Sequence, residues 1–384
     1  MTPKKDPEAD VRAAWLVLGM HRSGTSAVTQ LLALAGCDLP ANLMPGDEHN
    51  AKGYFEPWTI AMFNDDRLHA AGSAWDDVFA HPFRPLEPTA ERDFLDRAKA
   101  LFEDEFGGDR HPLLKDPRIT VLLPFWRNLF ADLALEARCV IPVRHPLAVA
   151  GSLARRDGFP PEKSVLLWCA YMLAAEVHTR DLPRAFVSYD ALLADWRTEV
   201  ARAEAALGAP LPALTREAGV AIDRFLSPDL RHNTTHEGLE ALGWAGALAQ
   251  PVLAWFEAAA AGQIREVAPL QQATAELVRR KGEFGMLVSP AARDMDVLRS
   301  EAHKLKQQLA WDRRKADELR TDMQRDIETI QAKWQSDVTA LQEQSLREVA
   351  EKEARLQALE AELEALRHAY ARAGAQLDRI LAES

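Results

Sequence analysis

The chain of 384 residues has few cysteines and no long apolar run. Its three cysteines are scattered, with neither the paired spacing of a metal site nor the pattern of a disulfide framework. Residues 1–15 contain no apolar stretch of the secretory kind, and no later stretch reaches the ~18 consecutive apolar residues of a membrane span. These absences predict a cytoplasmic protein in a reducing compartment, without a membrane span.

Basic residues are also in deficit. The chain has 46 Lys and Arg against 58 Asp and Glu, a formal net charge of -12. Nucleic-acid binding needs clustered positive charge, so no nucleic-acid partner is predicted. A small anionic ligand needs only a local positive site and stays possible. The hydrophobic fraction of 47% is enough for a sizeable core.

Glycine and proline are missing from residues 291–373, which are rich in Ala, Glu, Leu, Arg, Lys and Gln. Apolar residues recur there at alternating steps of three and four, with a stutter around Trp334. This spacing predicts a coiled coil over 291–384 that joins copies of the chain into a homo-oligomer, and the alternative is a single charged helix. The clearest part of the stripe is Leu356, Leu359, Leu363, Leu366, Tyr370, Ala373, Leu377 and Ile380.

Short apolar runs alternate with helical patterns in the first part of the chain. They lie at 14–19, 112–116, 138–145 and 184–190. Such alternation is typical of a parallel sheet with helices on both faces. Residues 12–285 are therefore predicted to form a three-layer α/β domain similar to the P-loop folds, ending near the segment GMLVSP at 285–290.

The first apolar run leads into GMHRSGTS at 19–26, a glycine-rich turn that opens a predicted helix. Backbone N–H groups and the helix dipole make such a turn an anion site. An ATP-binding P-loop would have lysine at the position of Thr25, and no acidic residue ends the third run, where Arg144 and His145 stand instead. The turn is thus expected to hold an anion through Arg22 and hydroxyl groups, with no metal. The alternative is a tight turn whose glycines serve geometry alone.

A second motif follows the third run, where VRHPLAVAGSL places Arg144 at the strand end and Ser152 on the next helix. HRSGTS together with this segment resembles the paired signature of the sulfotransferases that use 3′-phosphoadenosine 5′-phosphosulfate (PAPS). The resemblance covers about residues 12–240 and implies that Arg144 and Ser152 bind the 3′-phosphate. Arg22 stands where the cytosolic branch has lysine, as in the glycan and tyrosyl-protein branches. The residues that the resemblance assigns to the 5′-phosphosulfate are Arg22, Ser23, Gly24, Thr25 and Ser26.

Two charged residues are the predicted catalytic groups, together with Arg22. Lys115, in LLKDPRI, resembles the lysine of the KDP segment of tyrosyl-protein sulfotransferases, which implies stabilisation of the leaving group. Glu56, among aromatic residues in NAKGYFEPWTI, is the predicted general base. The alternatives are an ion pair of Lys115 with Asp116, and a salt bridge or helix cap for Glu56. The other candidates for the base are Asp47, Glu48, His49 and His21.

Weaker patterns complete the list of candidates. Arg155 and Arg156 either line the acceptor cleft or end a solvated helix. Trp58 is a possible platform for a sugar ring, whereas other tryptophans such as Trp75 and Trp126 fit a core better. A loop with Arg231 and His232 could close over the ligand. The run Arg280, Lys281 and Gly282 resembles the Arg-Lys-Gly loop of the cytosolic branch, but the rest of that pattern is missing.

The predicted activity is transfer of a sulfuryl group from PAPS to a hydroxyl acceptor on a carbohydrate. Transfer is expected to be direct and in line, because no activated Cys or Ser is evident to form a covalent intermediate. Two alternatives stay open at this point. One is a nucleotide-dependent kinase with an atypical P-loop, and the other is a coiled-coil interaction protein whose α/β domain binds a nucleotide without catalysis.

Overall fold

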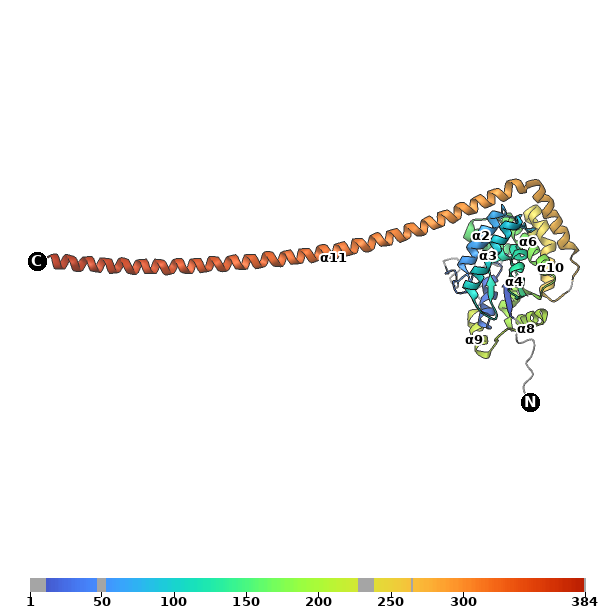
Figure 1. Ribbon diagram of the computed structural model, residues 1–384, viewed down its shortest axis with the longest axis horizontal. Helices are drawn as coiled ribbons and strands as arrows, with labels where there is room; N and C mark the ends of the chain where they lie inside the picture. Colours follow the sequence, from blue (N-terminus) through green and yellow to red (C-terminus); the bar gives the residue numbers. More distant parts are fainter. Residues whose placement is uncertain (1–11, 47–52, 227–237, 264, 383–384) are drawn as a thin grey trace, which may run out of the picture. The chain divides into compact units, whose positions relative to one another are not determined.

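The computed structural model describes residues 12–46, 53–226, 238–263 and 265–382. The chain divides into two compact units, Met1–Ser300 and Glu301–Ser384. The first is an α/β domain and the second consists of helix (Figure 1). The predicted fold class is confirmed, in the form of an α/β domain followed by a long C-terminal helix.

Four parallel strands form the sheet, in the order β2-β1-β3-β4. Each falls within or next to one of the four apolar runs, so the strand predictions are confirmed. In β1, Val17 lies opposite Lys115 of β2 and Val140 of β3. The carboxyl ends of these three strands therefore meet at one edge, where open α/β sheets bind ligands. The strands are β1 (Ala13–Val17), β2 (Leu113–Lys115), β3 (Glu136–Val143) and β4 (Arg184–Ser188).

Both faces of the sheet are buried, which is why its strands are almost wholly apolar. In β1, Leu16 belongs to one core cluster and the neighbouring Trp15 and Val17 belong to the other. The cluster of Trp15 contains residues of α1 (Thr25–Leu34), α7 (Tyr189–Ala194), α8 (Trp196–Leu207) and α9 (Arg216–Phe225). The cluster of Leu16 contains residues of α2 (Trp58–Ala70), α3 (Pro88–Phe106), α4 (Pro117–Asp132), α5 (Pro146–Asp157), α6 (Pro161–His178) and α10 (Gly243–Ala260).

Prolines start the helices that matter most for the site. Pro117 and Pro146 stand at the first positions of α4 and α5, where a missing N–H costs nothing. Asp116 and His145 precede them as N-caps, and each accepts a hydrogen bond from a backbone N–H of the first turn. Strands β2 and β3 thus turn into helices directly at the ligand-binding edge.

The last helix, α11 (Ala268–Ala382), begins earlier than the composition predicted. It continues through Gly282, Gly285 and Pro290, so the segment 285–290 is helical. Leu270 and Leu277 are fully buried in the first unit, and their packing offsets the low helix propensity of glycine and proline. That the second unit forms a coiled coil stays a prediction.

All three cysteines, Cys37, Cys139 and Cys169, are buried with free thiols. Within the described residues, no helix combines the length and the apolar character that a membrane span requires.

Candidate active site

The glycine-rich loop connects β1 to α1 in a conformation that its sequence explains. Gly19 and Gly24 have φ angles of 138° and 92°, values that glycine adopts readily. Arg22 has a φ of 67°, a strained conformation for a residue with a side chain. Gly24 is the N-cap of α1, and no described side chain caps the helix, so the N–H groups of its first turn are candidates to bind an anion.

Neighbouring elements hold this loop in place. The backbone N–H of Gly19 donates to Thr120 Oγ1 of α4 at 2.8 Å, and that hydroxyl lies 3.3 Å from the carbonyl oxygen of Gly19. On the other side, the ring of Tyr189 packs directly against Gly24. The guanidinium of Arg144 lies 4.7 Å from the centre of the same ring. Tyr189 was not among the predicted site residues.

The two predicted phosphate motifs meet in space although they are far apart in sequence. Arg22 Nε donates to Ser152 Oγ of α5 at 2.8 Å. One terminal nitrogen of Arg144 donates to the carbonyl oxygen of Arg22 at 2.9 Å. Burial lowers the pKa of both arginines, and further cations nearby add to the shift. Positive charge is therefore concentrated where an anion would be held.

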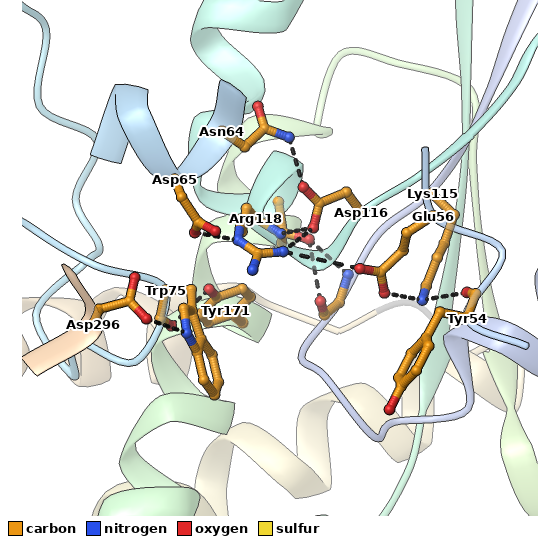
Figure 2. Close-up of polar contacts among 12 residues, drawn as sticks. Tyr54, Glu56, Asn64, Asp65, Trp75, Lys115, Asp116, Arg118, Tyr171 and Asp296 are labelled. Carbon is orange, nitrogen blue, oxygen red and sulfur yellow. Dashed lines mark hydrogen bonds and ion pairs between the residues drawn. The ribbon is translucent and has the colours of Figure 1, made fainter. Parts of the chain in front are cut away.

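Lys115 and Glu56 form a buried ion pair beside the loop (Figure 2). Lys115 Nζ also donates to the carbonyl oxygen of Tyr54 at 2.9 Å and lies 3.5 Å from Ser26 Oγ. Burial lowers the pKa of Lys115, and the charge of Glu56 opposes that shift. The expected alternative for Lys115, a pair with Asp116, is not the contact that forms. The expected salt bridge of Glu56 does form, with the predicted catalytic lysine as its partner.

The backbone around Glu56 fixes its position between α1 and α2. Leu43 and Pro57 form an isolated antiparallel bridge, and the N–H of Met44 donates to the carbonyl oxygen of Glu56 at 2.7 Å. Phe55, the preceding residue, has a φ of 56°. This second strained residue turns the chain so that the side chain of Glu56 is 96% buried at the end of β2.

A set of polar residues around Arg118 supports this pair and was not predicted. Arg118 lies 3.9 Å from Glu56 and forms ion pairs with Asp65 and Asp116 (Figure 2). Asn64 then donates to Asp116 at 2.7 Å. Burial raises the pKa of Asp65 to about 6, although Arg118 opposes that shift. Only the sequence KDPR hinted at this set, because its acidic and amide partners come from α2.

His21 is buried within the loop and is surrounded by cations. Its ring lies edge-on to Trp75, with 4.8 Å between ring centres. Burial holds the pKa of His21 well below its usual range, and the charges of Arg156, Arg118 and Lys115 lower it further. A neutral imidazole in this place suits positioning better than proton transfer.

The other predicted residues lie in several different parts of the chain. Trp58 is 38% exposed at the start of α2, whereas Trp75 and Trp126 are buried. Arg156 ends α5 with its guanidinium 5.3 Å from the centre of the Trp75 ring. The Arg280-Lys281-Gly282 run is helical in α11, with Arg280 paired to Glu276, so it forms no loop. The candidates Asp47, Glu48, His49, Arg231 and His232 lie outside the described residues.

No family model and no curated protein sequence matches this chain. Among solved structures, it is similar to the sulfotransferase domain of the olefin synthase of Synechococcus PCC 7002. The match covers 72% of this chain and 98% of that domain, with 16% sequence identity and a TM-score of 0.36. This similarity is distant and does not establish an activity. A function has to be argued from the side chains of the site.

The chemistry available at the site follows from these contacts. An uncapped helix start, two partly desolvated arginines and two hydroxyl groups can hold a dianionic ligand end. A carboxylate and an ammonium group lie next to that anion site, and each can exchange a proton or balance a charge. The arrangement therefore suits transfer of a group from a phosphorylated donor to an acceptor that loses a proton.

Proposed function

We propose that this chain is a sulfotransferase that moves a sulfuryl group from PAPS to a hydroxyl group. The observation that carries the proposal is the junction of the two motifs, in which Arg22 bonds to Ser152 and Arg144 bonds to the backbone of Arg22. A P-loop that binds ATP has no need of a second arginine-serine pair. A donor with phosphate at both its 3′ and 5′ positions requires one.

The residues of the loop fit such a donor. Ser23 Oγ and His21 Nε2 are buried polar atoms without a hydrogen-bond partner in the described structure. Buried polar groups are rarely left unpaired, and at functional sites a ligand commonly completes them. In the proposal, Arg22, Ser23, Gly24, Thr25 and Ser26 hold the 5′ end, and Arg144 with Ser152 holds the 3′-phosphate.

In the proposed reaction, the acceptor oxygen bonds to sulfur as the bond from sulfur to the bridging phosphate oxygen breaks. Glu56 takes the proton of the acceptor hydroxyl. Lys115 and Arg22 balance the negative charge that develops on the leaving phosphate oxygen. The products are a sulfate ester and 3′-phosphoadenosine 5′-phosphate. The half-exposed ring of Trp58, two residues after Glu56, supports a carbohydrate as the acceptor.

The first test needs no acceptor. The protein is titrated calorimetrically with 3′-phosphoadenosine 5′-phosphate, with and without magnesium, and with AMP and ATP as controls. We expect micromolar binding that depends on the 3′-phosphate and not on magnesium. Arg144→Ala should weaken it by about 10- to 100-fold, because a hydrogen bond to a charged group contributes about 1.5–3 kcal/mol.

Arg138→Ala is the matched control, since Arg138 lies on β3, the strand that leads to Arg144, and pairs with Glu136 away from the ligand-binding edge. Magnesium-dependent binding of ATP, without binding of the 3′-phosphorylated nucleotide, would favour the kinase alternative and refute the proposal.

The second unit supports a further part of the proposal, a homodimer joined by α11. Leu356, Leu359 and Leu363 are 57%, 46% and 49% exposed on the helix, and a second copy would cover them. With Leu356 and Leu363 at heptad position a, a parallel copy places its Glu360 beside Arg355 and its Arg367 beside Glu362. Opposite charges thus meet at the flanking positions of the stripe.

Light scattering after size-exclusion chromatography is expected to give twice the chain mass of 42.7 kDa. Leu363→Asp should shift the protein to monomer, because it puts a charge into each strand of the apolar seam. Glu364→Ala, one residue further around the helix, is the control. A wild-type protein that is monomeric at micromolar concentration would contradict the dimer.

A further inference from the structure

The turn of α11 that contains Asp296 is attached to the segment that carries Trp75. Asp296 is 7% exposed, and its carboxylate contacts Trp75 (Figure 2). Oδ1 accepts a hydrogen bond from Trp75 Nε1 at 2.9 Å, and Oδ2 lies 2.9 Å from His69 Nε2. Burial alone would lower the pKa of His69, but the hydrogen bond and charge of Asp296 raise it. Asp65 and Asp66 act in the same direction.

A second contact attaches the next turn of the helix to the next residue of the segment. Arg299 donates to Asp76 Oδ2 at 2.7 Å, and Lys163 of α6 donates to the same oxygen at 2.8 Å. Asp76 is 99% buried, so these two cations compensate a carboxylate that water does not reach. The part of α11 around Asp296 and Arg299 is therefore fixed to Trp75 and Asp76 by two separate sets of polar contacts.

The opposite side of Trp75 contacts the candidate active site. Its ring meets the ring of His21 edge-on, and the guanidinium of Arg156 lies over it at 5.3 Å. Phe159 stacks on it with ring centres 5.7 Å apart, and Tyr171 donates to its carbonyl oxygen at 2.8 Å. Trp75 is thus held between α11 and the phosphate loop.

We propose that Asp296 is a positioning residue, which fixes Trp75 and through it His21 and the strained loop at Arg22. The inference rests on the proposed function, since it concerns how that loop holds the nucleotide. A buried indole N–H without an acceptor is unfavourable, so loss of Asp296 favours other orientations of the ring. Helix α11 would then help to order the nucleotide site through Asp296.

The test uses the full chain and 3′-phosphoadenosine 5′-phosphate as the probe. Asp296→Ala is expected to weaken its binding by about tenfold, the effect of about 1.4 kcal/mol. Asp296→Asn should bind nearly as the wild type does, because its amide oxygen still accepts from Trp75 and its NH2 group can donate to His69. Asp294→Ala is the control, because Asp294 is exposed on the same helix and pairs with Arg293.

Trp75→Phe tests whether Asp296 acts on nucleotide binding through the indole N–H of Trp75 rather than through the stability of the fold. It removes the indole N–H and keeps an aromatic ring, so it should weaken binding about as much as Asp296→Ala. The double variant should bind no more weakly than either single variant, since both remove the same hydrogen bond.

If the wild type binds the nucleotide and folded Asp296→Ala binds it equally well, the role of Asp296 is refuted but the proposed function is not. The role of Asp296 is also refuted if the two substitutions add fully in the double variant. A wild type that binds no 3′-phosphorylated nucleotide refutes the proposed function, and the inference falls with it.

Discussion

Glu56→Gln is expected to lower kcat by about 10²- to 10⁴-fold, the range in which a general base contributes to catalysis. The assay is transfer of labelled sulfate from PAPS to an acceptor identified by screening glycans. Glutamine has the shape of glutamate and can accept a hydrogen bond from Lys115, but it takes no proton at neutral pH. Binding of 3′-phosphoadenosine 5′-phosphate should stay within a few-fold of wild type.

Substitution of Lys115, the partner of Glu56, distinguishes an effect on catalysis from an effect on stability. Lys115→Met leaves the carboxylate of Glu56 buried, with Arg118 3.9 Å away. Breaking a buried pair from one side costs about 3–5 kcal/mol, so Lys115→Met is expected to be strongly destabilised as well as inactive. In the double variant Glu56→Gln with Lys115→Met, no uncompensated charge is left from the pair. Its free energy of unfolding should recover much of this loss, while its kcat stays low.

A pair that only stabilises the fold gives a different result, because activity would then return together with stability in the double variant. Glu199→Gln is the matched control for loss of a buried carboxylate. Glu199 is 97% buried on α8 and pairs with Arg202, and it belongs to none of the elements that form the site. Normal turnover by Glu56→Gln would exclude Glu56 as the base.

The sequence predicted the features that depend on residues close together in the chain. Four apolar runs predicted four strands because a sheet buried on both faces needs them. The glycines of GMHRSGTS predicted a turn because positive φ angles suit glycine, and both Gly19 and Gly24 have positive φ angles. The motifs at Arg22 and Arg144 were predicted to act together on one ligand, and the parallel register of β1 and β3 places both at the same edge.

The features that were missed depend on contacts distant in sequence. Trp75 and Asp296 are 221 residues apart, and Arg118 reaches Asp65 on another helix. No local pattern shows such partners. The start of α11 was misplaced for a related reason. Gly282, Gly285 and Pro290 weaken a helix by about 1 kcal/mol per glycine and about 3 kcal/mol for proline, but the burial of Leu270 and Leu277 in the domain offsets this.

Gly24→Ala is expected to lower both the affinity for the nucleotide and the stability of the domain. The added Cβ would lie 2.2 Å from Tyr189 Cδ2 and 2.7 Å from Cε2, on a backbone with a φ of 92°. The φ angle alone costs a residue with a side chain about 1–2 kcal/mol. The clash adds to this, because Tyr189 is 96% buried and has little room to move. Arg144, which lies over the same ring, would be displaced with it.

The affinity for 3′-phosphoadenosine 5′-phosphate, measured by calorimetry, and the melting temperature should therefore both change. We expect affinity to fall by at least 100-fold and the melting temperature to fall by several degrees. Gly208→Ala separates backbone strain from the clash, because Gly208 has a φ of 67° with no atom within 4 Å of an added Cβ. It should lower stability slightly and leave affinity unchanged. Equal effects of the two substitutions would mean that the contact of Gly24 with Tyr189 does not shape the nucleotide site. A loss of affinity in Gly24→Ala alone would mean that Tyr189 holds Arg144 in position to bind its phosphate.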